Sequence, residues 1–277
     1  MSKKKSKILE DTINYLKFYK EYNNYEIYGG DVKENKQPFV SDSGKKISKP
    51  SEENIIKQKI ETAEIFPETV KEVAKKTEIK SIIKDNGKWK DSETLDKFYK
   101  EIENCKKCAE LSETRAQIVF GYGNPDADIV VVGEAPGAEE DKQGKPFVGR
   151  AGKLLTDILK AINFDREEIY ICNILKCRPP ENRNPHPDEI ENCEPYLFKQ
   201  LELIKPKMIL AVGTFAGQTL LKSKETLGQM RGKFHIYNGI KMMVTYHPAA
   251  LLRNPNWKKP TWEDVQLFRK EYDSMVK

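Results

Sequence analysis

The sequence predicts an α/β fold: a three-layer sandwich around a central, mainly parallel sheet, with a helical or partly disordered N-terminal extension. Two observations predict the sandwich. Apolar runs of strand length, rich in β-branched residues, recur at residues 128–133, 168–175 and 207–213. Segments with helical spacing of apolar residues lie between them, and strands that alternate with helices are typical of a sheet covered on both faces.

The first part of the chain differs in composition from the rest. Residues 1–100 contain 22 Lys and 18 acidic residues but no Arg and no Cys. We therefore expect an N-terminal extension over residues 1–95 and a functional domain over residues 96–277. Apolar spacing predicts a helix over residues 8–22 and two short helices within residues 52–85. The extension is either a solvated basic tail or a Lys-rich arm that attracts phosphates.

The functional domain opens with a helix, which apolar spacing predicts over residues 94–103. A brief apolar run predicts a short strand over residues 117–120. The strand at residues 128–133 leads into a long loop over residues 133–152, which is rich in glycine and acidic residues. Helical spacing returns at residues 153–162.

The remaining elements continue the alternation of strands and helices. In order they are a strand (168–175), a basic loop (176–185), a helix (188–203), a strand (207–213), a helix capped by Thr214 (214–221), a hairpin (229–247, its last strand at 241–246), a loop (247–255) and a closing helix (261–275). Three strands end directly in unusual loops, at Gly133, Asn173 and His247. Ligands bind outside the carboxyl ends of such strands, so these loops form one crevice if their strands are neighbours.

Charge and hydropathy narrow the class of protein. The net charge of +5 is small for 277 residues, which favours a local basic face over a uniformly basic surface. No apolar run approaches the roughly 18–20 residues of a membrane-spanning helix. The first residues are basic but lack the apolar core of a secretory signal. We expect a cytoplasmic protein, in which clustered cysteines are more often metal ligands than disulfides.

Four of the five cysteines have the spacing of a metal site. Cys105 and Cys108 form a C-x2-C pair, and Cys177 and Cys193 are separated by 15 residues. Four thiolates suit either tetrahedral zinc or an iron–sulfur cluster, and the spacing alone leaves both open. Cys172 lies in the middle of a strand and is expected to be a small buried apolar residue.

Several motifs follow one another along the chain: the C-x2-C pair, GEAPG followed by GKPFVGRAG, ICNILKCRPPENRNP, Cys193 followed by Glu-Pro-Tyr, and HPAALLRNP. In this order they resemble the motifs of the family 4 uracil-DNA glycosylases, the iron–sulfur branch of their superfamily. The resemblance covers residues 100–277 and implies a monofunctional glycosylase that starts base-excision repair. It also implies a structural [4Fe–4S] cluster on Cys105, Cys108, Cys177 and Cys193, which favours that group over zinc.

The resemblance assigns three residues to a pocket for a flipped base. It implies that Asn173 reads uracil, because an amide offers both a donor and an acceptor to the base edge. It implies that Phe147 stacks on the base through its π face. It implies that His247 donates to uracil O2, where negative charge develops as the glycosidic bond breaks.

The loop that begins at Gly133 supplies the other expected contacts. The backbone groups of Gly133, Ala135 and Gly137 are expected to lie against the base. We expect Glu134 to orient the attacking water and Glu140 to exclude the thymine methyl, with a solvated acidic loop as the alternative. Ala135 stands where the best-studied branch of the superfamily has a catalytic Asp, so the role of that Asp does not carry over.

DNA contacts are expected from the loops beside the pocket. An apolar wedge can enter the gap that a flipped base leaves, and basic side chains can hold phosphates. The wedge candidates are Leu251 and Leu252, and the phosphate candidates are Arg253, Arg178, Arg183 and Lys176. A solvated basic loop is the alternative for the last three.

The expected partner is uracil-containing DNA, single- or double-stranded. We expect no association with a membrane. A sliding clamp or other repair proteins are candidate partners, and we expect a nucleoid-associated monomer. One rival hypothesis is a non-catalytic, polymerase-associated module that binds nucleic acid and is held together by a cysteine metal site. A nucleotide-processing α/β enzyme is disfavoured, because the chain has neither a P-loop nor a dinucleotide-binding glycine motif.

Overall fold

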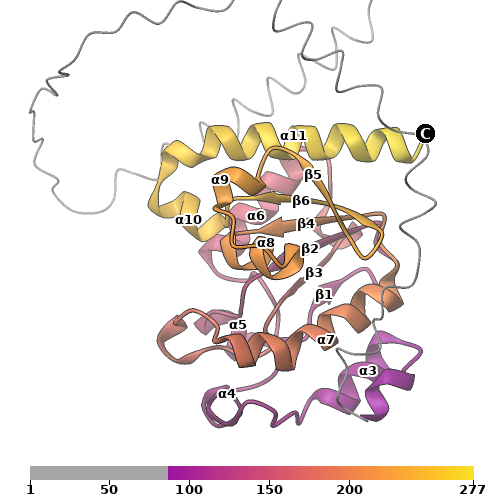
Figure 1. The fold of residues 1–277 in the computed structure, drawn as a ribbon, viewed down its shortest axis with the longest axis vertical. Coiled ribbons are helices and arrows are strands. Elements are labelled where there is room, and N and C mark those ends of the chain that lie inside the picture. Colours follow the sequence, from indigo (N-terminus) through magenta and orange to yellow (C-terminus); the bar gives the residue numbers. More distant parts are fainter. Residues whose placement is uncertain (1–86) are drawn as a thin grey trace, which may run out of the picture. The chain divides into compact units, whose positions relative to one another are not determined.

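Six strands form one sheet in the computed structural model, which describes residues 87–277 (Figure 1). The strand order is β1-β3-β2-β4-β6-β5. Four central strands run parallel: β3 (Tyr170–Asn173), β2 (Ile129–Gly133), β4 (Met208–Val212) and β6 (Ile240–Thr245). The edge strands β1 (Tyr122–Gly123) and β5 (Phe234–Tyr237) are antiparallel to their neighbours. The expected mainly parallel sheet is confirmed, whereas the helices expected before residue 86 lie outside the described residues.

Helices and short 3-10 turns connect the strands. The α-helices are α3 (Leu95–Ile102), α4 (Ala109–Thr114), α5 (Ala138–Gln143), α6 (Arg150–Ala161), α7 (Pro187–Ile204), α8 (Thr214–Leu221), α9 (Leu227–Met230), α10 (Pro248–Arg253) and α11 (Lys258–Met275). The 3-10 turns are η3 (Lys88–Asp91), η4 (Arg166–Glu168), η5 (Pro180–Asn182) and η6 (Pro255–Trp257). No helix in this described part is long and apolar enough to cross a membrane.

Two apolar cores lie on the two faces of the sheet. Side chains alternate along a strand, so Val132 faces one core and Val131 the other. The first core is closed by apolar residues of α3, α7 and α8, and the second by those of α6, α10 and α11. Because both faces are covered, the central strands are apolar throughout, and the three-layer sandwich is confirmed.

Several local expectations are wrong. The apolar run at residues 117–120 is no strand; Val119 makes a single backbone hydrogen bond to the Lys176 carbonyl, and the strand β1 comes after it. The loop at residues 133–152 contains α5 and the start of α6, and the loop at residues 247–255 contains α10. Thr214 is the first residue of α8, and Gly213 occupies the cap position.

The compact fold also extends ahead of the boundary expected after residue 95. Trp89 is buried, and its ring lies 5.6 Å from that of Phe98 and 5.0 Å from that of Tyr196, centroid to centroid. Residues from η3 onward therefore pack with the sheet domain.

The order of the strands places the binding crevice. From β2 the chain passes first to β3 on one side of β2 and then to β4 on its other side. Such a reversal opens a crevice outside the carboxyl ends of the strands. β6 is separated from β2 by β4, so the three expected loops are not all neighbours, and the end of β4 at Gly213 lies between them.

Candidate active site

A cleft of about 740 Å³ lies at the carboxyl ends of the parallel strands. Asn173 is the last residue of β3, and Glu134, Gly213 and His247 lie after the ends of β2, β4 and β6. All four residues line the cleft. Gly213 has a φ of +100°, and a β-carbon at this position would lie 3.1 Å from Cβ of His247. A glycine is therefore needed to let the His247 loop close over the end of β4. The apolar run that ends in Gly213, like the one that ends in Gly133, is the sequence signal that identifies this fourth wall.

Gly133 leaves room for two side chains that line the cleft. A β-carbon on Gly133 would lie 2.3 Å from Oδ1 of Asn173 and 2.7 Å from Cζ of Phe147. Both neighbours also line the cleft, so any side chain here would intrude between the amide and the aromatic ring. Ala135 and Gly137 line the same cleft as Asn173 and Phe147, whereas Gly133, which was also expected to contact the base, is not among the residues that line it.

Asn173 presents a buried acceptor without a donor. The residue is 2% exposed, and its Oδ1 is the buried side-chain atom of the described residues that has no hydrogen-bond partner. An orphaned buried acceptor is costly, and native proteins keep one where a ligand will satisfy it. The cleft is therefore prepared for a ligand that donates a hydrogen bond at this point.

The buried Lys176 side chain binds the main chain of Asn173. Nζ of Lys176 donates to the Asn173 carbonyl at 2.8 Å and to Oε1 of Gln200 at 2.5 Å. Nε2 of Gln200 in turn donates to the Phe120 carbonyl at 2.8 Å. Lys176 is 1% exposed, so the expectation that it holds a DNA phosphate is wrong. It is a structural support of the Asn173 backbone.

His247 is fixed as a neutral donor. The backbone N–H of Ala249 donates to its Nδ1 at 3.1 Å, which places the ring proton on Nε2. Burial, together with the nearby Arg253 charge, lowers the pKa of His247 to about 4. The imidazole is therefore uncharged at neutral pH and has one N–H group free to donate.

Two acidic residues of the cleft have different environments. Burial raises the pKa of Glu134 to about 6, which is typical of a carboxyl that exchanges protons near neutral pH. Glu140 instead accepts the backbone N–H groups of Val148 and Gly149 at 3.2 and 3.3 Å. Glu140 therefore holds the chain just after Phe147 as well as lining the cleft.

Phe147 is held in a strained conformation. Its φ is +53°, a left-handed conformation that is unusual for a large side chain. Arg166 donates to its carbonyl at 3.0 Å, and a β-carbon on Gly152 would lie 1.8 Å from that same oxygen. Arg166 and Gly152 thus keep the Phe147 ring turned into the cleft, and neither role was predicted from the sequence.

The residues expected to touch DNA differ in whether the structure leaves their side chains available. Leu252 is 41% exposed and Arg253 lines the cleft, so both remain available to a substrate. Leu251 is fully buried in the core against α6, because α10 turns it inward, and its expected role as a wedge is wrong. Nε of Arg178 donates to Oδ1 of Asn182 at 2.9 Å. Arg183 lines the cleft but is engaged by carboxylates.

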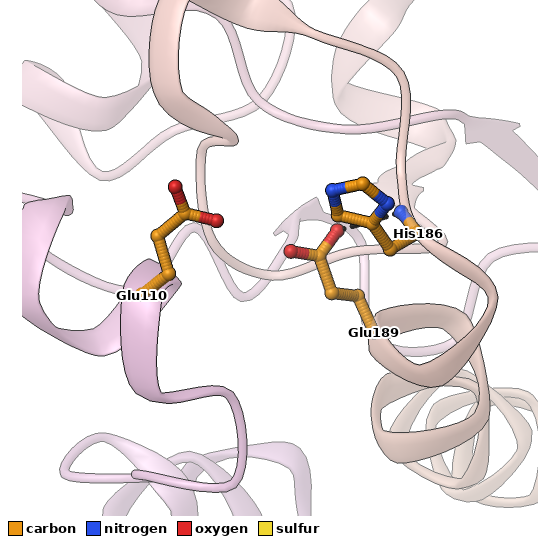
Figure 2. Close-up of side chains that lie close together, drawn as sticks. All are labelled: Glu110, His186 and Glu189. Atoms are coloured by element: carbon orange, nitrogen blue, oxygen red, sulfur yellow. Dashed lines mark hydrogen bonds between the residues drawn. The ribbon is translucent and has the colours of Figure 1, made fainter.

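Arg183 is the centre of an acidic cluster. Glu110 on α4 and Glu189 near the start of α7 meet beside His186, with potential ligand atoms within 4.8 Å of one another (Figure 2). The Arg183 guanidinium donates to Glu110 at 2.6 Å and to both oxygens of Glu189 at 2.6 and 3.0 Å. A cation is therefore already in place, and the cluster is an ion-pair network that ties α4 to α7.

The four expected cysteine ligands line one small cavity between α4, α7 and the loop after β3. Each sulfur accepts a hydrogen bond, as metal-bound thiolates commonly do. The donors are Tyr196 Oη to Cys105 (3.4 Å), Asn192 Nδ2 to Cys108 (3.7 Å), Arg115 Nη1 to Cys177 (3.0 Å) and Lys176 N to Cys193 (3.2 Å). Cys172 is buried in β3, as expected, and lies outside this cavity.

The spacing of the sulfurs bears on the group they could hold. Four thiolates at the usual 2.3 Å from one zinc ion lie about 3.8 Å from one another. Among the described residues, Glu110, His186 and Glu189 form the group of possible metal ligands whose ligand atoms all lie within 4.8 Å of one another. No three of the cysteine sulfurs lie as close together as this. The cysteine site is thus more open than a single-ion site, which fits a larger metal group.

Fold, cleft and cysteine site together define a member of a known superfamily. Residues 120–266 match the model of the uracil DNA glycosylase superfamily, and the chain belongs to it. Within this superfamily the chain belongs to the type-4 uracil-DNA glycosylases. It is 44% identical over 193 residues to the type-4 uracil-DNA glycosylase of Archaeoglobus fulgidus, covering 67% of this chain and 91% of that protein.

Two other relatives support the same assignment. The type-4 uracil-DNA glycosylase of Saccharolobus solfataricus is 45% identical over 66% of this chain and 88% of its own length. That of Sulfurisphaera tokodaii is 42% identical over 64% of this chain and 84% of its own length. The resemblance noted from the motifs is therefore confirmed.

Proposed function

We propose that this chain, as a uracil-DNA glycosylase, flips uracil out of DNA and hydrolyses its N-glycosidic bond, the first step of base-excision repair. The observation that carries the proposal is the orphaned Oδ1 of Asn173, because uracil N3–H is a donor that would satisfy it. The amide N–H₂ of Asn173 would then face uracil O4. A cytosine ring has no proton at N3 and an amino group at position 4, so it would leave both amide groups unpaired.

The proposed chemistry uses the neutral imidazole. As the C1′–N1 bond breaks, positive charge develops on the sugar and negative charge on uracil O2. Nε2–H of His247 would donate to that oxygen and stabilise the transition state more than the ground state. Because the pKa of His247 is lowered to about 4, uracil would leave as an anion that is hydrogen-bonded to the ring and not protonated by it.

Water is the proposed nucleophile, and Glu134 its base. The water oxygen would bond to C1′ while the electrons of the C1′–N1 bond leave with uracil, and the water proton would pass to the Glu134 carboxylate. The pKa of Glu134, raised by burial to about 6, suits such a transfer near neutral pH. The ionised carboxylate would also balance the positive charge on the sugar.

The Phe147 ring is the proposed stacking surface for the flipped base, at a depth set by Gly133. We retain Glu140 as the residue that excludes the thymine methyl. Its carboxylate contacts the backbone of Val148 and Gly149, so it would act partly by holding the Phe147 ring in position.

We propose a [4Fe–4S] cluster with a structural role on Cys105, Cys108, Cys177 and Cys193. The hydrogen-bond donor on each sulfur and the open spacing of the site support it. Such a cluster would tie the segment before α4 to α7 and to the loop after β3. Lys176 joins this region to the Asn173 backbone, so the cluster would steady the base-reading amide.

Leu252, Arg253 and Arg178 are the proposed DNA contacts of this enzyme. Arg183 is not retained among them, because Glu110 and Glu189 already engage its guanidinium. We further propose that it works as a cytoplasmic, nucleoid-associated monomer, with a sliding clamp as a candidate partner. Sedimentation of the purified chain with and without a clamp protein tests the last two points. The polymerase-associated, non-catalytic alternative is set aside, because the chain matches most of the length of enzymes of the type-4 family.

Binding of the free base tests the assignment of the pocket. The N3–H resonance of ¹⁵N-labelled uracil is expected to shift on addition of the wild-type protein and to stay unchanged with Asn173→Ala. Thymine, with its extra methyl group, serves as the control ligand and should bind more weakly. Equal shifts with the wild-type protein and Asn173→Ala would remove Asn173 from the pocket.

A further inference from the structure

One tryptophan is exposed at the edge of the cleft. Trp257, the last residue of η6, is 37% exposed and lines the same cleft as His247. The chain contains three tryptophans, and the other two, Trp89 and Trp262, are buried. Exposed aromatic residues at a binding cleft usually mark a contact with a ligand.

The ring of Trp257 is held by a second ring. It stacks on Tyr246, with ring centroids 5.0 Å apart and planes 15° from parallel. The guanidinium of Arg231 also lies over the Tyr246 ring, 5.8 Å from its centroid. Arg231 is fixed in turn by two hydrogen bonds to the buried Asp264, at 2.8 and 2.9 Å. The stack is therefore anchored in the core of the domain.

The backbone of Trp257 is fixed as well. Its N–H donates to the Asn254 carbonyl at 3.2 Å, and its carbonyl accepts the Thr261 hydroxyl at 2.7 Å. A flat, exposed ring held in this way loses little conformational freedom when a second flat ring stacks on it. Preorganised aromatic surfaces of this kind bind nucleic-acid bases regardless of sequence.

We propose that Trp257, backed by Tyr246, is a stacking platform for the base adjacent to the flipped uracil on the same strand. The inference rests on the proposed function, because it needs a uracil nucleotide in the cleft. A strand with one nucleotide in the cleft must leave it past the residues that line it, which include Trp257 and Arg253, and the exposed Leu252 precedes Arg253 in the chain. Arg253 would face the phosphate next to that base, and Trp257 would replace the stacking partner that the base loses when uracil flips.

The platform is tested by removing the Trp257 ring from the protein and, separately, the neighbouring base from the DNA. The full-length, metal-loaded protein and its Trp257→Ala variant are compared on single-stranded oligonucleotides with one uracil. In two further substrates, a tetrahydrofuran spacer without a base replaces the nucleotide on the 5′ or the 3′ side of uracil. Stacking of one base on an aromatic ring corresponds to about 5- to 150-fold in affinity, so kcat/KM should fall by that factor in Trp257→Ala, mainly through KM.

The decisive result is whether the effects of Trp257→Ala and of the spacer on the reaction rate depend on each other. A spacer on one side should reduce the wild-type rate to that of Trp257→Ala and leave the variant unchanged, whereas a spacer on the other side should affect both proteins equally. Trp257→Phe should retain most activity. Leu267→Ala is the control, because Leu267 is also 37% exposed but does not line the cleft. A Trp257→Ala loss that persists with either spacer, or no loss, overturns the platform.

A binding readout separates this inference from the proposed function. Because Trp257 is the exposed tryptophan, stacking should quench the fluorescence of the wild-type protein when it binds the oligonucleotide, and this quenching should be lost in Trp257→Phe. If uracil is not released but quenching occurs, the proposed hydrolysis fails, whereas the stacking of a base on Trp257 stands. If uracil is released without quenching and Trp257→Ala is fully active, the platform alone fails.

Discussion

The rings of Phe147 and His247 lie 5.4 Å apart, centroid to centroid, with 32° between their planes. The two residues come from motifs after β2 and after β6, and both line the cleft. Their contact joins the proposed stacking surface to the proposed donor, so one flipped base would meet both.

Replacement of His247 should slow the chemical step and spare DNA binding. His247→Ala removes the Nε2–H donor, and loss of one such donor typically lowers kcat by about 10²- to 10³-fold. Single-turnover rates measure the loss, and fluorescence anisotropy measures binding. His235→Gln is the control, because His235 lies outside the cleft and contacts the Met230 carbonyl. A fully active His247→Ala would remove the histidine from the mechanism.

The pH profile should report Glu134. A base must be ionised to act, and burial raises the pKa of Glu134 to about 6, so kcat/KM should fall as the pH drops below about 6. His247, with a pKa lowered to about 4, stays neutral through this range and should add no step there. Glu134→Gln should lower the rate by about 10²- to 10⁴-fold and abolish the step near pH 6. A step that persists in Glu134→Gln belongs to another group.

Asn173→Asp should impair the reading of uracil. The carboxylate keeps an acceptor but loses the amide donor for O4, and it brings a charge into a buried site. An unpaired buried polar group costs about 1–3 kcal/mol, so kcat/KM for uracil should fall by about 5- to 150-fold. Chromatography of the free bases released from uracil- and cytosine-containing oligonucleotides measures both rate and selectivity. Unchanged values for both would show that another residue reads the base.

A methyl group at Gly133 should block the pocket. The β-carbon of Gly133→Ala would collide with Oδ1 of Asn173 and with the Phe147 ring, so uracil release should fall below detection while the fold persists. Gly149→Ala is the matched control, since its β-carbon would meet nothing closer than 3.7 Å. Circular dichroism checks the fold of both variants. Activity in Gly133→Ala close to that of the control would mean that the base does not enter here.

Loss of one cysteine ligand should release the metal group. Cys193→Ser is expected to lose most bound iron and sulfide, together with visible absorption. Its Tm should fall by about 5–10 °C, because each kcal/mol lost shifts the Tm of a domain of this size by about 2–4 °C. Cys172→Ala, which alters a buried cysteine outside the cavity, should keep its iron. A colourless wild-type protein loaded with zinc would contradict the cluster.

The sequence alone predicted the features that depend on local pattern. Apolar β-branched runs located the central strands, and two polar residues at or just beyond their ends, Asn173 and His247, proved to share one cleft. The topology explains this success, since the carboxyl ends of parallel strands meet at one edge of the sheet. The six-residue helices α5 and α10 were missed, because a helix of fewer than two turns shows little periodicity.

The features that were missed depend on distant partners. Lys176 reads as a solvated basic residue in its loop, yet it is buried, and Gln200 on α7 and the Asn173 carbonyl accept hydrogen bonds from its Nζ. Leu251 reads as an exposed wedge, yet α10 packs it against the core. The stack of Trp257 on Tyr246 likewise joins the end of β6 to η6. None of these contacts leaves a periodic or spacing signal in the chain.

Hydrolysis of the N-glycosidic bond of uracil in DNA is the activity that we propose for the cleft. Its most direct test is the release of free uracil by the purified, full-length, metal-loaded protein from oligonucleotides with one uracil, both single-stranded and paired with guanine. We expect stoichiometric free uracil and an alkali-labile abasic site at that position, with no strand cleavage before alkali and no release from the matching thymine oligonucleotide. Absence of free uracil from both substrates, with the iron content intact, would contradict it.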